Sequence, residues 1–160
     1  MYSSAAFIHF DDLSISQRCD SIVVRMYTSI QAIIKRINTQ IFEDLDNLEV
    51  EHSLFGRSFI KLYDAINHLM RLEEHVLFQY IKTSEQTQQT LILRTNSVEQ
   101  HKKHQYQLQE LMLLVRTEYL VLLGTKSYNS IETIIDQDLF QLDFQLKQWI
   151  FWVTNSILKQ

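Results

Sequence analysis

The most informative feature of this sequence is what it lacks: its 160 residues include no proline and only two glycines, Gly56 and Gly124. Proline breaks helices and tight β-hairpins depend on glycine, so a chain almost without either favours long helices. The length fits one domain with a core of ordinary size. We therefore predict a single all-α domain that spans residues 1–160.

Cysteine, long apolar runs and charge of one sign are scarce as well. The single cysteine, Cys19, excludes an intramolecular disulfide, and the start of the chain lacks the cationic and apolar regions of a signal peptide. The longest apolar runs are far too short to span a bilayer. Acids and bases are interspersed, with a net charge of −4 and no basic stripe for nucleic acid. These absences predict a cytoplasmic protein that binds neither nucleic acid nor membrane.

What the sequence does contain is a helical period, because apolar residues recur at steps of three and four along most of the chain. Helices that each carry one apolar stripe and are joined by short links favour an up-down-up-down four-helix bundle. Residues 1–13 are predicted to form an N-terminal arm, and whether residues 84–96 form a loop or a helix stays open. The four predicted helices span residues 14–42, 45–83, 97–124 and 129–158.

Three sites mark helix ends in the sequence. Ser14 with Gln17 and Ser97 with Gln100 have the spacing of capping boxes, which predicts a helix start at each. Gly124 is predicted to end the third helix as a C-terminal cap.

The second helix carries polar residues on its inward stripe. At steps of three and four, this stripe includes His52, Glu73, Val76 and Tyr80. A carboxylate that faces a core costs several kcal/mol unless it is paired, hydrogen-bonded or bound to a metal. Glu73 is therefore either a site residue or a residue at the edge of the stripe, where it reaches water or accepts a hydrogen bond from a tyrosine or histidine.

His101 on the third helix is the predicted neighbour of Glu73. If the intervening turn is centred near Thr87, the two residues lie equally far from it and come level in an antiparallel pair. The next turn places the same layer beside Trp149, whose bulk closes it. On the first helix the layer falls near Ile15–Cys19, where a single buried thiol is predicted to be a core residue.

The remaining histidines are weaker candidates. His68 and His75 lie about 10 Å apart along the helix, too far to chelate one ion, and they are predicted to be surface residues. His104 lies one turn from His101 and could grip the same metal ion, but the two lysines between them indicate a solvated face.

Other signals of chemistry are few. Glu49 and His52 have the Glu-x-x-His spacing that di-iron bundles use twice, but there is no second copy on another helix. The sequence has no glycine-rich phosphate loop, no nucleophile elbow and no cysteine pair spaced for zinc. We therefore predict that the protein is not an enzyme.

Two short segments and one histidine resemble a known family. Glu73–Phe78, EEHVLF, resembles the EExxLFP signature that ends a ligand-bearing helix in hemerythrin-like (HHE) domains and in the related iron-sulfur repair proteins. Asn155–Leu158, NSIL, resembles the matching ENxILFP signature of the second half, and His101 resembles the histidine of the third helix. The likeness covers roughly Ile15–Gln160. It implies a four-helix bundle that holds a di-iron site.

The departures from the family pattern fall on its metal ligands. Where the resemblance implies a histidine one turn before each signature glutamate, this chain has Leu69 and Ile150, and the second glutamate is Thr154. Trp149 lies one residue from the expected histidine in the second half. On the first helix, where the family carries another histidine, the best-matching region is Tyr27–Thr28.

Only Glu73 and His101 carry over as metal ligands, with His68, His104 and His52 as candidate helpers. Two ligands cannot hold a di-iron centre, whose ions need several histidines and bridging carboxylates.

Three functional hypotheses follow. The first is a hemerythrin-like bundle that has lost its di-iron site, needs no cofactor and acts as a binding, regulatory or interaction module. Its surface for a homodimer or a protein partner would be Leu111–Val115, Tyr119–Leu123 and Trp149–Val153. The alternative is a non-haem iron protein with a rearranged di-iron or single-iron site that binds O₂ or NO or handles iron and oxidative stress. The third is a small apolar pocket near Glu73 and His101 for a ligand such as a lipid or haem.

Overall fold

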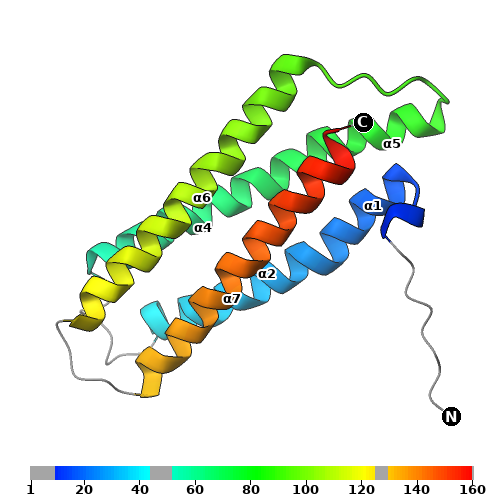
Figure 1. Ribbon diagram of the computed structural model, residues 1–160. Helices are drawn as coiled ribbons and strands as arrows, with labels where there is room; N and C mark the ends of the chain where they lie inside the picture. The colour runs from blue at the N-terminus through cyan, green and yellow to red at the C-terminus, as the bar shows by residue number, and fades with distance from the viewer. Residues whose placement is uncertain (1–9, 44–51, 125–129, 160) are drawn as a thin grey trace, which may run out of the picture.

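The computed structural model describes residues 10–43, 52–124 and 130–159, which form four long helical rods with no β-strand among them (Figure 1). A short 3-10 turn, η1 (Phe10–Asp12), precedes the first rod. The prediction of an all-α protein is confirmed. The rods are α1 (Ile15–Ser21), η2 (Ile22–Tyr27), α2 (Thr28–Asn38) and η3 (Thr39–Glu43); α4 (Leu54–Leu72), η5 (Glu73–Leu77) and α5 (Phe78–Gln86); α6 (Thr95–Gly124); and α7 (Ser130–Trp152) with η6 (Val153–Ile157).

Local signals at the first helix start behave as the sequence predicts. The Ser14 hydroxyl accepts from the Gln17 backbone N–H at 3.2 Å, and the Gln17 side chain accepts from the Ser14 backbone N–H at 2.9 Å. This is a complete capping box. The predicted cap at Ser97 is wrong, because α6 already begins at Thr95. The described part of α6 ends at Gly124, and because residues 125–129 lie outside the described residues, the predicted cap there stays a prediction.

The second rod begins later than predicted. Its N-cap is Ser53, whose hydroxyl accepts from the Gly56 N–H at 3.1 Å, so the helix starts at Leu54 and not near residue 45. His52 consequently precedes the helix and is exposed, and its predicted place on the buried stripe is wrong. Residues 44–51, which include Glu49, lie outside the described residues.

The stretch 84–96, left open by the sequence, contains a connection between two helices. α5 ends in a Schellman motif, in which the Gln89 N–H donates to the Ser84 carbonyl at 3.0 Å and the Gln88 N–H to the Glu85 carbonyl at 3.2 Å. Gln88 has a φ of 53°, a left-handed conformation that side chains rarely adopt. Residues 88–94 are not helical, and the Tyr80 hydroxyl donates to the Ile92 carbonyl at 2.9 Å.

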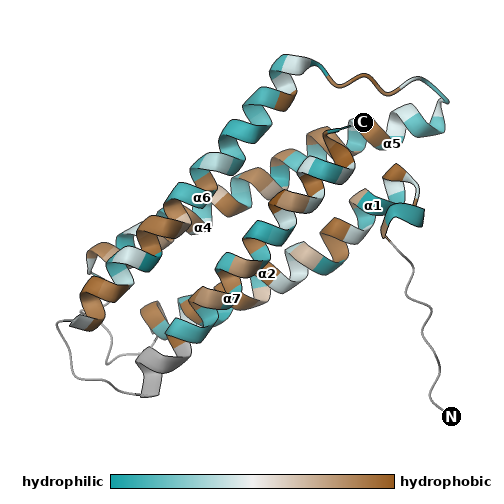
Figure 2. Cartoon of the chain, in the orientation of Figure 1, coloured by the Kyte–Doolittle hydropathy of each residue, from teal (hydrophilic) through white to brown (hydrophobic). Residues whose placement is uncertain are grey.

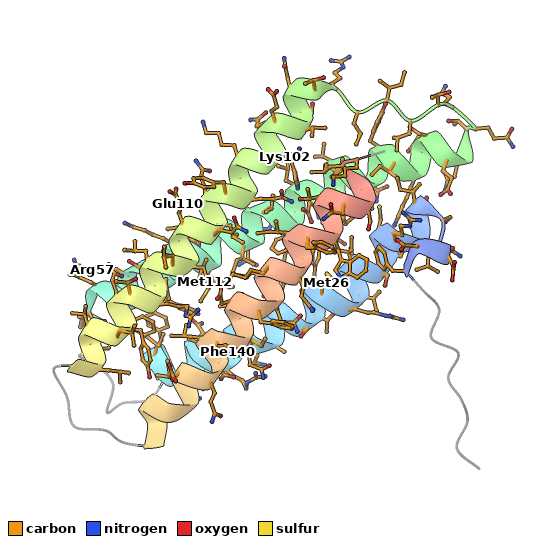
Figure 3. All side chains as sticks on the ribbon, viewed as in Figure 1. Met26, Arg57, Lys102, Glu110, Met112 and Phe140 are labelled. Atoms are coloured by element: carbon orange, nitrogen blue, oxygen red, sulfur yellow. The ribbon has the colours of Figure 1, made fainter. Side chains whose placement is uncertain are left out.

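The core lies between the rods, with α4 along α6 and α2 along α7. Hydrophobic and hydrophilic residues alternate along each rod (Figure 2). On α6, Met112 faces inward, whereas Lys102 and Glu110 lie on the outer side (Figure 3). Ion pairs between neighbouring rods join Arg36 to Asp138, Arg116 to Asp143 and Lys82 to Asp20.

All three of the predicted surface segments contribute residues to the core instead. Val115 and Tyr119 are buried, as are Trp149 and Val153, so those positions cannot meet a partner. Phe151 is exposed, and the neighbouring Trp152 packs on Phe10 with 4.4 Å between ring centroids. Within the predicted N-terminal arm, Phe10 thus packs on the bundle, whereas residues 1–9 lie outside the described residues. In the described part of the chain, no helix has an apolar stretch of the length needed to cross a bilayer.

Candidate functional site

Glu73 is fully buried between the rods, with an exposed fraction of 0%. It follows Leu62, Ile66 and Leu69 on the buried stripe of α4, which explains why the fold carries a carboxylate inward. It is also the first residue of the π-helical turn η5. Such turns are rare insertions in α-helices and are frequent at functional sites.

The carboxylate of Glu73 accepts a hydrogen bond from each of the three other rods. The Tyr27 hydroxyl and the Trp149 indole Nε1–H both donate to Oε2, the latter at 2.7 Å. His101 Nε2 lies 2.8 Å from Oε1. An ionised carboxylate only accepts, so His101 Nε2 is the donor in this contact whenever Glu73 carries its charge. We call Glu73, Tyr27, His101 and Trp149 the Glu73 cluster.

The rings of the Glu73 cluster support one another. The Tyr27 and Trp149 rings meet edge to face with 5.4 Å between their centroids, a favourable geometry for an aromatic pair. Burial, and then the adjacent charge of Glu73, raise the pKa of Tyr27 well above its usual range. Tyr27 therefore stays a protonated donor at any physiological pH.

The prediction that Glu73 lies at the same height in the bundle as His101 and Trp149 is confirmed by these hydrogen bonds. The predicted level on the first helix, near Ile15–Cys19, is wrong, because Tyr27 is the residue that reaches Glu73. The cause is the late start of the second rod: Glu73 lies 19 residues after Leu54, closer to the start of its rod than predicted, so it meets a later residue of the antiparallel first rod.

Two other inward positions were also predicted wrongly. Val76 and Tyr80 are exposed, whereas Phe78 and Ile81 are buried. The turn η5 holds one residue more per turn than an α-helix, so the buried face shifts by one residue after Glu73. A strict period of three and four cannot anticipate such an insertion.

Cys19 lies in the core of the first rod and contacts no other cysteine. Burial raises the pKa of its thiol to about 12. The side chain therefore stays a neutral thiol, as the predicted core role requires.

The candidate helper histidines do not join the Glu73 cluster. His52 and His68 are exposed, and so is His75, as predicted for His68 and His75. The His68 and His104 rings meet edge to face with 5.6 Å between centroids. Within the described ranges, no three His, Cys, Asp or Glu side chains are grouped closely enough to hold one metal ion.

The residues at the positions where the resemblance implies further metal ligands make other contacts within the protein. Leu69 is buried in the core, and the Thr154 hydroxyl donates to the Gln105 side-chain oxygen at 3.2 Å. Neither side chain can supply a charge or an imidazole to a metal.

A cavity of about 680 Å³ opens beside His101. The second rod, the 88–94 connection, the first turns of α6 and Leu158 form its walls. The lining residues are His68, Leu72, Val76, Leu77, Tyr80, Ile92, Leu93, Arg94, Ser97, Val98, Gln100, His101, His104 and Leu158. His101 therefore belongs both to the Glu73 cluster and to the cavity.

Three features of this site were not predicted. Trp149 was expected to be apolar bulk, although a buried indole N–H usually finds a hydrogen-bond partner, and that rule could have identified it as a donor. Tyr27 was noted only as a departure from the family pattern. A pocket near Glu73 and His101 was one of the predicted alternatives, but the wall that the 88–94 connection forms was not predicted, because the sequence carries no periodic signal there. Comparisons of the chain with family models, curated proteins and solved structures found no match.

Proposed function

We propose that the protein is a hemerythrin-like, up-down-up-down bundle in which a hydrogen-bonded carboxylate replaces a di-iron site, and that it works as a metal-independent binding module. The observation that carries this proposal is the set of three donors on Glu73, one from each other rod.

A carboxylate binds iron through oxygen lone pairs, and here both oxygens already accept protein N–H or O–H groups. Two of the donors lie close to positions where the resemblance implies histidine ligands. Tyr27 lies in the best-matching region of the first helix, and Trp149 lies one residue from the histidine expected in the second half. Neither the protonated phenol nor the indole N–H offers a lone pair suited to iron at this point. The residues of the Glu73 cluster thus satisfy one another, which favours a structural role for them.

The binding role is supported by the cavity next to the cluster. Pockets for small molecules typically measure about 300–1,000 Å³ and combine apolar walls with a few polar groups. The cavity fits this description, with a volume of about 680 Å³ and mostly apolar walls.

Metal analysis tests the proposal most directly. Protein purified without chelators is expected to contain far less than one iron per chain and to unfold at the same urea concentration with and without EDTA. About two irons per chain would overturn the proposal in favour of a di-iron protein.

A pair of adjacent acids gives a matched test of the cluster. Glu73→Gln removes the charge that three donors share and is expected to lower the unfolding free energy by about 1–3 kcal/mol. Glu74→Gln, the matched control at the half-buried neighbouring position, is expected to change it by about 0.5 kcal/mol or less. Equal effects of the two substitutions in urea titrations would contradict the role assigned to Glu73.

A further inference from the structure

The cavity beside His101 has an apolar wall that is open to solvent. Val76, Tyr80 and Ile92 line it and are 59%, 47% and 67% exposed. Grouped apolar side chains that stay exposed in a concave surface mark a binding site more often than chance exposure does. The turn η5 directs Val76 and Tyr80 to this wall.

The wall is held in place before any ligand arrives. The Tyr80 hydroxyl donates to the Ile92 carbonyl at 2.9 Å, which fixes the 88–94 connection to the second rod. Leu93, which directly follows Ile92, is partly buried and packs against the core. A preformed wall reduces the ordering cost of binding.

The polar part of the lining is cationic or neutral. It contains Arg94, three histidines, Ser97 and Gln100, and no aspartate or glutamate. Among the described residues, no carboxylate forms an ion pair with Arg94. Glu73 contacts His101 but does not line the cavity, and its carboxylate already has three side-chain hydrogen-bond partners.

The shape and charge of the lining exclude other ligand classes. An amphiphile with a cationic head would meet Arg94 without a compensating acid. The His68 and His104 rings meet edge to face with 5.6 Å between their centroids, so they contact each other and are not arranged as an axial pair for a haem iron.

We propose that this cavity binds a single-chain anionic amphiphile, such as a medium- or long-chain carboxylate, taken up as a free monomer. The carboxylate lies at Arg94, and the hydrocarbon chain lies along Val76, Tyr80 and Ile92. This proposal rests on the proposed binding role but not on the absence of iron, so metal analysis and ligand titration can fail separately.

The first test is calorimetric titration of the full chain with decanoate below its micellar concentration. We expect one decanoate per chain, at least tenfold weaker binding of decyltrimethylammonium, which has the same chain and the opposite charge, and no heat from acetate. Equal binding of the two amphiphiles, or binding of acetate, would overturn the proposal.

Variants locate the site. Arg94→Gln is expected to weaken decanoate binding about tenfold, the effect of one lost charge-assisted contact. Lys102→Gln, the matched control, removes an exposed cation of α6 outside the lining and is expected to leave binding unchanged. If Arg94→Gln binds decanoate with the affinity of the parent protein, the carboxylate of the ligand does not lie at Arg94.

A blocking variant tests the apolar wall. Ile92→Trp fills the cavity from the non-helical connection and is expected to abolish decanoate binding while the urea midpoint stays near that of the parent. Val76→Trp, from the helical side, provides a second blocking variant if the first one unfolds. Full binding by a folded blocking variant would contradict the site.

A flotation assay separates the free monomer from a membrane source. We expect no co-flotation with vesicles of phosphatidylglycerol. Co-flotation that Arg94→Gln abolishes would show that the cavity reads a lipid surface and would overturn the proposal.

Discussion

Glu73 shows how a single buried charge can be accommodated without a metal. Desolvation of an isolated carboxylate costs many kcal/mol, whereas hydrogen bonds to a charged group each contribute about 1.5–3 kcal/mol. Three such bonds converge on Glu73, and two of them come from rings whose apolar bodies also fill the core. The same residues therefore supply both polarity and packing at one point.

Removal of one donor from the cluster should be measurable. Tyr27→Phe keeps the ring but leaves Oε2 with Trp149 alone, and we expect the unfolding free energy to fall by about 1–3 kcal/mol. Urea denaturation measures this change. Tyr63→Phe, at a half-buried position away from Glu73, serves as the control and should cost about 0.5 kcal/mol or less. A silent Tyr27→Phe would mean that the hydroxyl contributes nothing to the cluster.

The thiol of Cys19 should be unreactive in the folded protein. Burial raises its pKa to about 12, so almost no thiolate exists at pH 8. The thiol of the unfolded chain ionises near its ordinary pKa of 9.0, whereas the folded thiol ionises only near pH 12. The unfolding free energy therefore falls as the pH rises from 9.0 to about 12. Ellman's reagent at pH 8 should label Cys19 only after urea is added. Rapid labelling without urea would show that the site is open to solvent.

At the scale of the elements, helical periodicity was sufficient to predict an all-helical chain and the approximate extent of most rods, but not every helix start. The capping box at Ser14 worked because both reciprocal bonds are encoded locally. The start of the second rod was missed because Ser53 has Gly56, not Glu or Gln, three residues later, while His52 continues the apolar spacing. The π-helical turns were missed for a deeper reason: their extra residue is stabilised by tertiary contacts and leaves no repeat in the sequence.

The end of α5 offers a test of backbone strain. Gln88 has a φ of 53°, a conformation that glycine adopts at little cost. We expect Gln88→Gly to raise the unfolding free energy by about 0.5–1 kcal/mol. Gln89→Gly, one residue later and without a positive φ, should bring no gain, and thermal denaturation of both variants makes the comparison. A loss of stability in Gln88→Gly would indicate that the glutamine side chain matters more than the strain.

At the scale of the whole molecule, an apolar strip on α6 and α7 lacks a partner within the described residues. Phe140, Phe144 and Phe151 lie on one outward line of α7, and Leu113 and Leu120 are exposed on α6. The ion pair of Arg116 with Asp143, at 2.8 Å, holds the two helices side by side at this face. This strip includes part of the surface that the sequence predicts for a partner, although Trp149 and Val153, which belong to the predicted surface, are buried in the core.

We expect this strip to pair with a second copy of the chain. Light scattering after size exclusion should give a dimer, and Phe144→Glu should give a monomer because it places a charge in the interface. Val24→Glu, at an exposed apolar position of the first rod, is the matched control and should stay dimeric. A monomer at every concentration of the parent protein would rule the dimer out.

The turn η5 sets the phase between two halves of one helix. Before it, the buried face runs through Leu69 to Glu73, and after it through Phe78 and Ile81. Deletion of one residue between Glu74 and Leu77 would restore a plain α-helix and keep Phe78 and Ile81 on the buried face, whereas an α-helical turn without a deletion would rotate everything from Phe78 to Gln86 by about 100° about the axis. In evolutionary terms, the turn absorbs a one-residue insertion: the extra residue is taken up within η5, and the buried faces on both sides of it keep their places in the core.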